Sequence, residues 1–292
     1  MKDTLESLRH KIGMANELNS VVRTMKALSA SSINQYEKAV TSLEDYYRTV
    51  KWGLYVCLAA AKASIQQGTT KKGKVAAIIF GAGQGLVGQF NDALCQYAAA
   101  ELEKLPGEKV IWTVGVSLQG RLEDRGFPPV QQFEVPHTVE AITPLVGQFL
   151  SKIEQALEQE EVSTIYLFYN RPQKGAIYGP VQLRFVPLDE IWQKEIRTIE
   201  WPSPKIPETL YDPALTLLAL VREYFFVTLY RACAESLASE NASRLAAMQR
   251  AEKNIKELLT DLTMSYHQLR QSSIDEEMFD VIFGAEALAK RG

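Results

Sequence analysis

One stretch near the C-terminus contains no helix-breaking residue, and it constrains the fold more than any other feature. Residues 214–283 hold neither glycine nor proline and are rich in Ala, Leu, Glu, Lys, Gln and Arg, which favour helices. An unbroken helix over this stretch would be about 105 Å long. A compact globule of this chain length has a radius of gyration of only about 19 Å. We therefore expect a helix that projects from its own domain.

The N-terminal stretch predicts a second long helix that pairs with the first. Asp3 or Thr4 can serve as its N-cap, and Glu6 lies in the first turn. Apolar residues then recur at steps of three and four, as in a coiled-coil seam, at Leu5, Leu8, Ile12, Ala15, Leu18, Val22, Met25 and Leu28. A matching stripe near the C-terminus consists of Leu245, Met248, Ile255, Leu258, Leu262, Tyr266 and Leu269. We expect helices over residues 1–65 and 210–290 to form an antiparallel coiled coil.

The middle of the chain, residues 74–205, has a different pattern and predicts an α/β domain. Short apolar runs typical of buried strands occupy residues 75–80, 110–116 and 163–169. Helical stretches lie between them, at residues 90–105 and 139–159. This alternation indicates a Rossmann-like domain with a mainly parallel sheet. A fourth strand, at residues 181–186, would pair with the third as a hairpin.

Composition narrows the class of protein. The net charge of -3 gives no overall attraction to nucleic acid or acidic lipid, so we expect no nucleic-acid partner. Cys57, Cys95 and Cys233 are far apart in sequence, without metal-ligand spacing, and suit a reducing compartment. The first residues lack the apolar core of a signal peptide, and no uninterrupted apolar run reaches the ~20 residues that span a bilayer. We expect a soluble or peripheral cytoplasmic protein.

A glycine-rich turn follows the first predicted strand. Gly83, Gly85 and Gly88 satisfy the G-x-G-x-x-G pattern of dinucleotide-binding domains. That interpretation also requires an acidic residue at the end of the second strand, to hold the ribose. The second strand ends in Val116 and Ser117 instead, and the nearest acid, Glu108, precedes it. We favour a tight structural turn over a cofactor site, and we predict no cofactor.

Two further features bear on function. His10, His137 and His267 are isolated and form no metal-ligand or nucleophile–base spacing, so we predict neither a metal site nor catalytic residues. Residues 278–288 are apolar on nearly every face of the expected helix. A tip that projects into water should be polar, so this one either folds back on itself or needs a surrounding partner.

Several motifs resemble those of the gamma subunit of F-type ATP synthases, along the whole chain. Residues 8–12 (LRHKI) and 22–30 (VRTMKALSA) are similar to the family's I-R-x-K-I and T-x-A-M-x-M-V-A-A segments. Residues 85–91 (GLVGQFN) resemble its G-L-C-G-x-F-N turn. Residues 239–248 (SENASRLAAM) resemble S-E-x-A-A-R-M-x-A-M. Residues 266–271 (YHQLRQ) with Ile274, and 284–288 (GAEAL), resemble Y-N-x-x-R-Q-x-x-I and G-A-x-A-L.

The resemblance implies a torque-carrying rotor shaft rather than an enzyme. The paired terminal helices would stand inside a ring of three alpha and three beta subunits, which do the nucleotide chemistry. The α/β domain would sit with epsilon on the membrane's c-ring, whose turning couples proton or sodium flow to ATP synthesis or hydrolysis. The resemblance thus implies a peripheral protein at the cytoplasmic face of the plasma membrane, held there by its complex alone.

Roles carried over from the family fall on ten residues. Met25 would face the acidic lever of beta, with Arg23 and Lys26 making ionic contacts beside it. Arg270 and Gln271 would hydrogen-bond to a catch loop on beta, and Arg244 matches the arginine of the A-R-M segment. The apolar bearing would be lined by Met278, Val281, Ile282 and Leu288.

Departures from the family pattern indicate a divergent branch, such as the alternate F-type ATPases. His267 replaces the usual Asn, Leu245 the usual Met, and Phe226 an acid near the base of the shaft. Two other classes of protein compete with the rotor shaft. One is an NAD(P)-binding oxidoreductase built on the glycine turn, and the other is a free-standing coiled-coil scaffold that dimerises through its seam.

Overall fold

The computed structural model describes residues 4–60, 73–205, 207–210 and 212–289, with side chains as far as Phe283 apart from that of Ala60. The chain divides into two compact units. The larger comprises Ser29–Arg244, and the smaller comprises Met1–Leu28 together with Leu245–Gly292.

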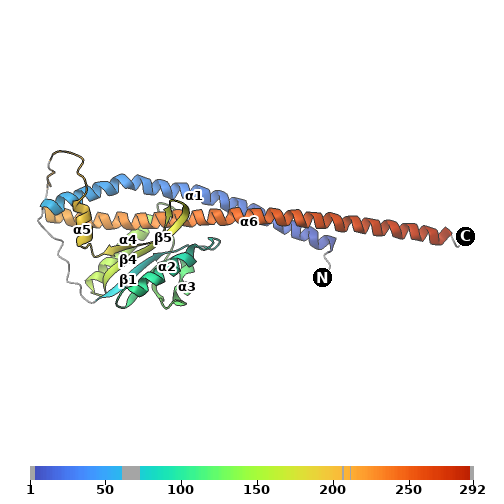
Figure 1. Cartoon of the computed structure of the whole chain (residues 1–292), viewed down its shortest axis with the longest axis horizontal. Helices are drawn as coiled ribbons and strands as arrows, with labels where there is room; N and C mark the ends of the chain where they lie inside the picture. Colours follow the sequence, from blue (N-terminus) through green and yellow to red (C-terminus); the bar gives the residue numbers. More distant parts are fainter. Residues whose placement is uncertain (1–3, 61–72, 206, 211, 290–292) are drawn as a thin grey trace. The chain divides into compact units, whose positions relative to one another are not determined.

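The larger unit contains a five-stranded sheet in the order β3-β2-β1-β4-β5 (Figure 1). Strands β1, β2, β3 and β4 run parallel to one another, and β5 is antiparallel to β4. The strands are β1 (Lys74–Phe80), β2 (Lys109–Val114), β3 (Pro129–Phe133), β4 (Val162–Gln173) and β5 (Ala176–Val186). The helices are α1 (Leu5–Ala60), α2 (Phe90–Lys104), α3 (Gln119–Glu123), α4 (Ile142–Glu158), α5 (Glu190–Arg197) and α6 (Pro213–Ala289), with a 3-10 turn, η1, at Val116–Leu118.

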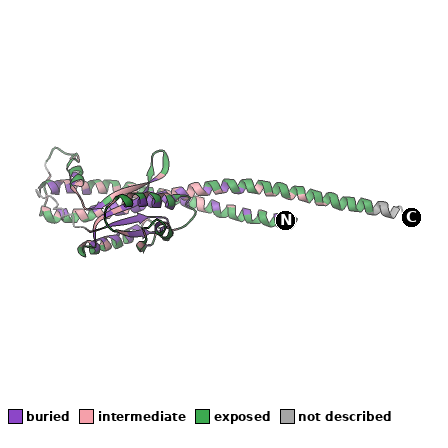
Figure 2. Ribbon diagram, turned by 60° about the horizontal axis from the view of Figure 1, so that its bottom comes forward, coloured by how far each residue is buried: buried purple, intermediate pink, exposed green. Residues whose placement is uncertain are grey.

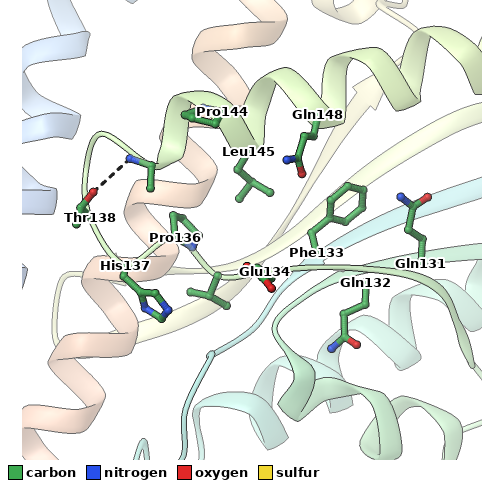
Figure 3. A pocket seen from close by; sticks show the side chains of 12 residues that line it. Gln131, Gln132, Phe133, Glu134, Pro136, His137, Thr138, Pro144, Leu145 and Gln148 are labelled. Carbon is green, nitrogen blue, oxygen red and sulfur yellow. Dashed lines mark hydrogen bonds between the residues drawn. The ribbon is translucent and has the colours of Figure 1, made fainter.

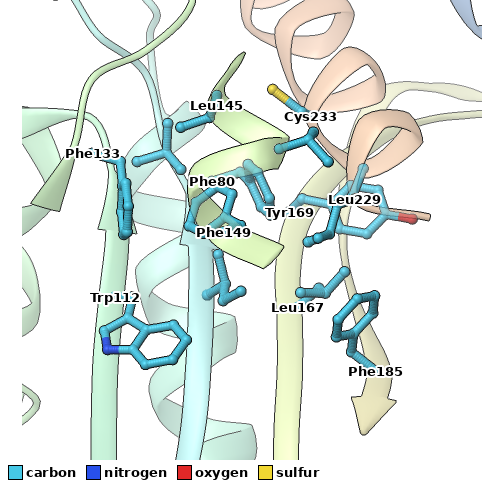
Figure 4. Packing of buried hydrophobic residues seen from close by; sticks show 14 of the residues in the cluster. Phe80, Trp112, Phe133, Leu145, Phe149, Leu167, Tyr169, Phe185, Leu229 and Cys233 are labelled. Carbon is cyan, nitrogen blue, oxygen red and sulfur yellow. The ribbon is translucent and has the colours of Figure 1, made fainter. Parts of the chain in front are cut away.

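Strand β1 is the centre of the domain because both of its faces are covered. Ala77 and Ile79 pack against α2, η1 and α3, in a cluster that includes Leu94. Ala76, Ile78 and Phe80 lie on the other face, in a cluster with residues of α4, α6 and α1. Figure 4 shows Phe80 beside Phe149 of α4 in this cluster. The continuous apolar sequence of β1 follows from this, since a parallel strand between two helical layers has no solvent face.

Helices α1 and α6 pair antiparallel within the larger unit. The Tyr46 hydroxyl donates to a Glu223 carboxylate oxygen at 2.7 Å, and the rings of Tyr47 and Tyr224 stack with centroids 5.8 Å apart. Leu54 of α1 is buried in a cluster with residues of α6 and α5.

In the smaller unit, the two helices meet along an apolar seam. Val22 of α1 packs with Met248 and Ile255 of α6, and the partly buried Met25 lies in the same cluster. From about Thr260 onward, α6 is largely exposed in this unit (Figure 2).

The fold class predicted from the sequence is confirmed: long N- and C-terminal helices pair antiparallel, and a mainly parallel α/β domain lies between them in sequence. Of the two proposed N-caps, Thr4 acts as one, because its hydroxyl accepts from the Ser7 N–H at 3.2 Å. Asp3, residues 61–65 and residue 290 lie outside the described residues. Strand β3 and helix α5 were not predicted.

Part of α6 also passes a simple test for membrane spans. An 18-residue window within Pro213–Phe283 reaches a mean hydropathy of 1.3, so by length and composition alone it could cross a bilayer. Core helices of soluble proteins meet the same criterion. In α6 the region in question carries Arg222 and Glu223, and Leu217 and Tyr224 pack against α1.

Candidate functional site

The glycine turn after β1 is held tightly by its surroundings. A Cβ added at Gly81 would lie 2.4–2.7 Å from side-chain carbons of the buried Leu118, so no larger residue fits there without displacement. The Ala82 N–H donates to Asn91 Oδ1 at 2.9 Å. These contacts explain a small residue at position 81 by packing, with no need for a ligand.

Helix α6 occupies the place where a Rossmann-like sheet binds ligands. That place is the crevice at the C-terminal ends of the strands where the strand order reverses, here between β1 and β4. The Ser236 hydroxyl donates to the Phe80 carbonyl oxygen at 3.1 Å, and the Ser243 hydroxyl donates to that of Val87 at 2.6 Å. The occupied crevice favours the structural interpretation of the turn over a dinucleotide site.

A buried ion pair lies beside this turn. Arg244 donates to the Glu240 carboxylate, and both Arg244 and the Gly83 backbone favour the ionised form of that carboxylate. Burial raises the pKa of Glu240, against the opposing effect of Arg244. The pair borders a cavity of about 110 Å³ that is also lined by Tyr36, whose pKa is raised to about 12 chiefly by burial, and by His137. The predicted partner contact of Arg244 stays a prediction, and within this chain its side chain pairs with Glu240.

The predicted cationic residues of α1 converge on one carboxylate of α6 in the smaller unit. Glu252 lies 2.5 Å from Lys26 Nζ, 3.0 Å from Lys256 Nζ and 3.5 Å from Arg23 Nε. The hydrogen bonds from Lys26 and Lys256 lower the pKa of Glu252 to about 2. Met25, expected to face beta, packs partly into the seam with α6.

The other predicted contact residues follow along α6. Arg270 and Gln271 are exposed. The apolar side chains Met278, Val281 and Ile282 are exposed to 51%, 72% and 45%, although water-facing positions normally carry polar groups. Leu288 lies in α6, but its side chain is outside the described residues. The roles of all these residues stay predictions.

An open groove of about 510 Å³ runs along the end of β3 and the start of α4 (Figure 3). Its lining includes Phe133, His137, Leu145 and Gln148. Among the described residues, no group of three or more His, Cys, Asp or Glu side chains is placed to hold a metal ion. The lining also presents the amides of Gln131 and Gln132 and the side chains of Glu134 and Thr138.

Comparisons with known proteins point in one direction. The ATP synthase gamma chain of Pelotomaculum thermopropionicum is 26% identical over 291 residues, covering 98% of this chain and 99% of that relative. The gamma chain of Syntrophus aciditrophicus is 26% identical over 305 residues, with the same coverage. A family model described as ATP synthase matches residues 4–288. The chain belongs to the ATP synthase gamma-chain family.

Solved structures agree on the gamma-chain fold. The rotor of the Euglena gracilis mitochondrial ATP synthase matches with a TM-score of 0.60 at 16% identity, covering 92% of this chain and 98% of that one. The central stalk and c-ring structure from Tetrahymena thermophila matches with a TM-score of 0.55 at 15% identity, covering 79% and 99%. At these identities the likeness concerns the fold.

Sequence reasoning missed the residues that hold the gamma-chain fold together. The sequence indicated Glu252 only weakly. It is an acid within the C-terminal stripe, and it can reach basic residues of α1 once the two helices pair. Ser236 and Ser243 carried another, since both lie on the apolar side of a long helix. A buried hydroxyl needs a hydrogen-bond partner, but the sequence does not identify that partner as a turn more than a hundred residues away.

Proposed function

We propose that this gamma-family chain is the non-catalytic central-stalk subunit of an F-type ATP synthase and that it carries torque. Its partners would be the alpha and beta subunits, three of each, together with epsilon and the c-ring. The chain would be peripheral at the cytoplasmic face of the plasma membrane and would reach it only through the complex.

The observation that carries this proposal is the exposed end of α6. Apolar side chains from Met278 to Phe283 face water, and a sleeve of partner subunits would remove that surface from water at about 25 cal/mol per Å². The continuous α6 helix, Pro213–Ala289, supplies the stiffness that a shaft needs. The coupled ion, proton or sodium, is determined by other subunits.

Within this function, we assign contacts along α6 and α1. Arg270 and Gln271 are exposed and free to hydrogen-bond to a loop of beta. Met25, Arg23 and Lys26 would meet the acidic lever of beta, where the acid of beta would compete with Glu252 for the two cations. Met278, Val281, Ile282 and Leu288 would line the bearing.

Reconstitution tests the proposal. Mixing the chain with alpha and beta subunits from the same source should yield a complex with three alpha, three beta and one copy of this chain, with ATP hydrolysis raised over alpha and beta alone. A chain that does not bind folded partners would refute the proposal. Complex mass and ATP turnover are the two measurements.

A double variant then tests the contact assignment. Arg270→Ala with Gln271→Ala should lower the stimulated turnover about tenfold, because hydrogen bonds to charged groups contribute about 1.5–3 kcal/mol. Arg250→Ala with Gln249→Ala is the matched control, since both residues are exposed on the same helix. Equal turnover in the two double variants would contradict the assignment to Arg270 and Gln271.

A further inference from the structure

Three polar side chains of α6 share one buried face beside the glycine turn. Ser236, Glu240 and Ser243 are spaced by four and three residues, which places them on one side of a helix. They are exposed to only 4%, 5% and 6%. Buried polar groups are normally hydrogen-bonded, and the two serines find their partners in the same short segment.

Those partners are backbone groups at successive points of residues 80–87. Ser236 donates to the Phe80 carbonyl oxygen at the end of β1, and Ser243 donates to the Val87 carbonyl oxygen at the far end of the turn. Glu240 lies between the two serines along the helix and accepts from Arg244. The two serines thus tie the helix to the turn at its beginning and at its end.

The segment that receives these bonds is itself anchored to the sheet. Asn91 Oδ1 accepts from the Ala82 N–H at 2.9 Å, and Asn170 Nδ2 of β4 donates to the Phe90 carbonyl oxygen at 3.1 Å. The Tyr178 ring of β5 packs edge-on against Phe90, with centroids 5.3 Å apart. A pull on the turn is therefore passed to β1, β4 and β5.

Directional bonds resist a motion that apolar packing tolerates. Apolar contact is non-directional, so a helix held by it alone can slip along or around its axis. A slip of one residue moves an α-helix by about 1.5 Å and turns its side chains by a large angle. Such a slip would break both serine contacts, because a hydrogen bond weakens steeply as its length and angle depart from the optimum.

We propose that Ser236 and Ser243 form a latch by which α6 grips the turn at residues 80–87, and that this latch transmits torque between the helix and the α/β domain. The latch rests on the proposed rotor function and names residues that carry it. Glu240 lies between the two serines on the same face of α6 and pairs with Arg244.

The test compares variants in the complete, membrane-bound complex. The variants are Ser236→Ala, Ser243→Ala and the double variant. Each substitution removes one hydroxyl without adding atoms. Thr216→Ala is the matched control, since the Thr216 hydroxyl donates to the carbonyl oxygen of Asp212, just before α6, and not to the turn. Two quantities are measured in sealed vesicles: ATP hydrolysis without an opposing ion gradient, and the largest ion gradient that ATP hydrolysis sustains.

The double variant should hydrolyse ATP at the wild-type rate without load but sustain a smaller gradient, with each single variant intermediate. Amide exchange at residues 82–87 should be about 30-fold faster in the double variant, the effect of losing two hydrogen bonds of ordinary strength. A purely structural role would change exchange and thermal stability but leave the sustained gradient at the control value.

Each outcome distinguishes the latch from the rotor function itself. A gradient equal to that of Thr216→Ala, in the double variant or in both single variants, would overturn the latch while leaving the rotor function intact. Loss of unloaded hydrolysis together with the gradient would also overturn it. Failure of the wild-type chain to assemble with its partners would instead refute the proposed function.

Discussion

At the scale of single residues, Glu252 illustrates how one carboxylate organises the smaller unit. It lies 2.5 Å from Lys26 Nζ and 3.0 Å from Lys256 Nζ, so it ties α1 to α6 and also braces α6 internally. Its side chain is only 12% exposed, and contacts of this kind are less screened by salt than those on an open surface.

Replacement of Glu252 should have a pH-dependent effect. The pKa of Glu252 is lowered to about 2, below the value near 4.3 of an unfolded chain. The stabilisation is therefore fully present above about pH 4.3 and is lost as the pH falls toward 2. The melting temperature of Glu252→Gln should lie below that of wild type at pH 7, and the gap should shrink between pH 4.5 and 3.

Glu257→Gln is the control for this effect, because Glu257 is 65% exposed and lies 3.9 Å from Lys253 Nζ. Its melting temperature should match that of wild type at every pH. If the difference in melting temperature between wild type and Glu252→Gln stayed constant across the acid range, the stabilisation would not come from the ionised carboxylate. Circular dichroism of the full chain provides the measurement.

The apolar seam offers a second test at residue scale. Met248 is 2% exposed and packs with Val22 and Ile255, so Met248→Ala should lower the free energy of unfolding of the smaller unit by about 2 kcal/mol or more. Met264→Ala on the same helix should change it by less than about 0.5 kcal/mol, because Met264 is 54% exposed. Amide exchange along residues 245–260 reports the difference, and equal protection in the two variants would contradict the seam.

At the scale of elements, the junction after β2 depends on glycine for two reasons. Gly115 has φ of +96°, and a Cβ there would lie 2.6 Å from the Ala82 carbonyl oxygen. Gly115→Ala should therefore destabilise the α/β domain by about 3 kcal/mol. Gly147→Ala, inside α4 where a Cβ meets nothing within 4 Å, should instead stabilise it by about 0.5–1 kcal/mol. In urea unfolding, the free energy of unfolding should fall for Gly115→Ala and rise for Gly147→Ala. A change in the same direction for both variants would contradict this account.

The longest and most periodic elements were predictable from sequence, and the shortest were not. Helix α6 follows from a stretch without glycine or proline, and β1 from a continuous apolar run. Strand β3 begins with Pro129, is five residues long and alternates in burial at the edge of the sheet, so its local signal is weak. Helix α5 is eight residues long and depends on the Asp189 cap, whose side chain accepts from the Trp192 N–H.

The candidate site was predictable only where family motifs mark it. Arg270 and Gln271 were assigned by resemblance and are exposed, and their contacts with another chain stay a prediction. Arg244 was assigned by the same route, yet its environment is set by Glu240, four residues earlier on the same helix. A single sequence does not separate these cases, because a motif records that an arginine is present and not which group it meets. The divergent-branch assignment also stays a prediction.

At the scale of the whole molecule, the two compact units predict separable stability. The larger unit, Ser29–Arg244, contains the sheet, its covering helices and their cores. A chain limited to these residues should unfold cooperatively, with a midpoint within a few degrees of the α/β transition of the full chain. Differential scanning calorimetry of both chains tests this.

A second experiment on the full chain complements this prediction and uses Met248→Ala, a substitution in the apolar seam of the smaller unit. Met248→Ala should leave the midpoint of the α/β transition unchanged, because additivity holds for sites that share no contacts. Two outcomes would show that the molecule unfolds as one unit. In one, the shorter chain melts without cooperativity; in the other, Met248→Ala destabilises the α/β transition as much as it destabilises the smaller unit.

The serine contacts between α6 and the turn carry no net charge. Dissolved ions largely screen the attraction between exposed charges that lie more than about 10 Å apart at 0.1 M salt, but they have little effect on a buried hydroxyl–carbonyl pair. Neither Ser236 nor Ser243 gains or loses a proton in the physiological range. The strength of these two hydrogen bonds should therefore be the same at low and at high salt concentration, and the same a unit or two of pH above or below 7.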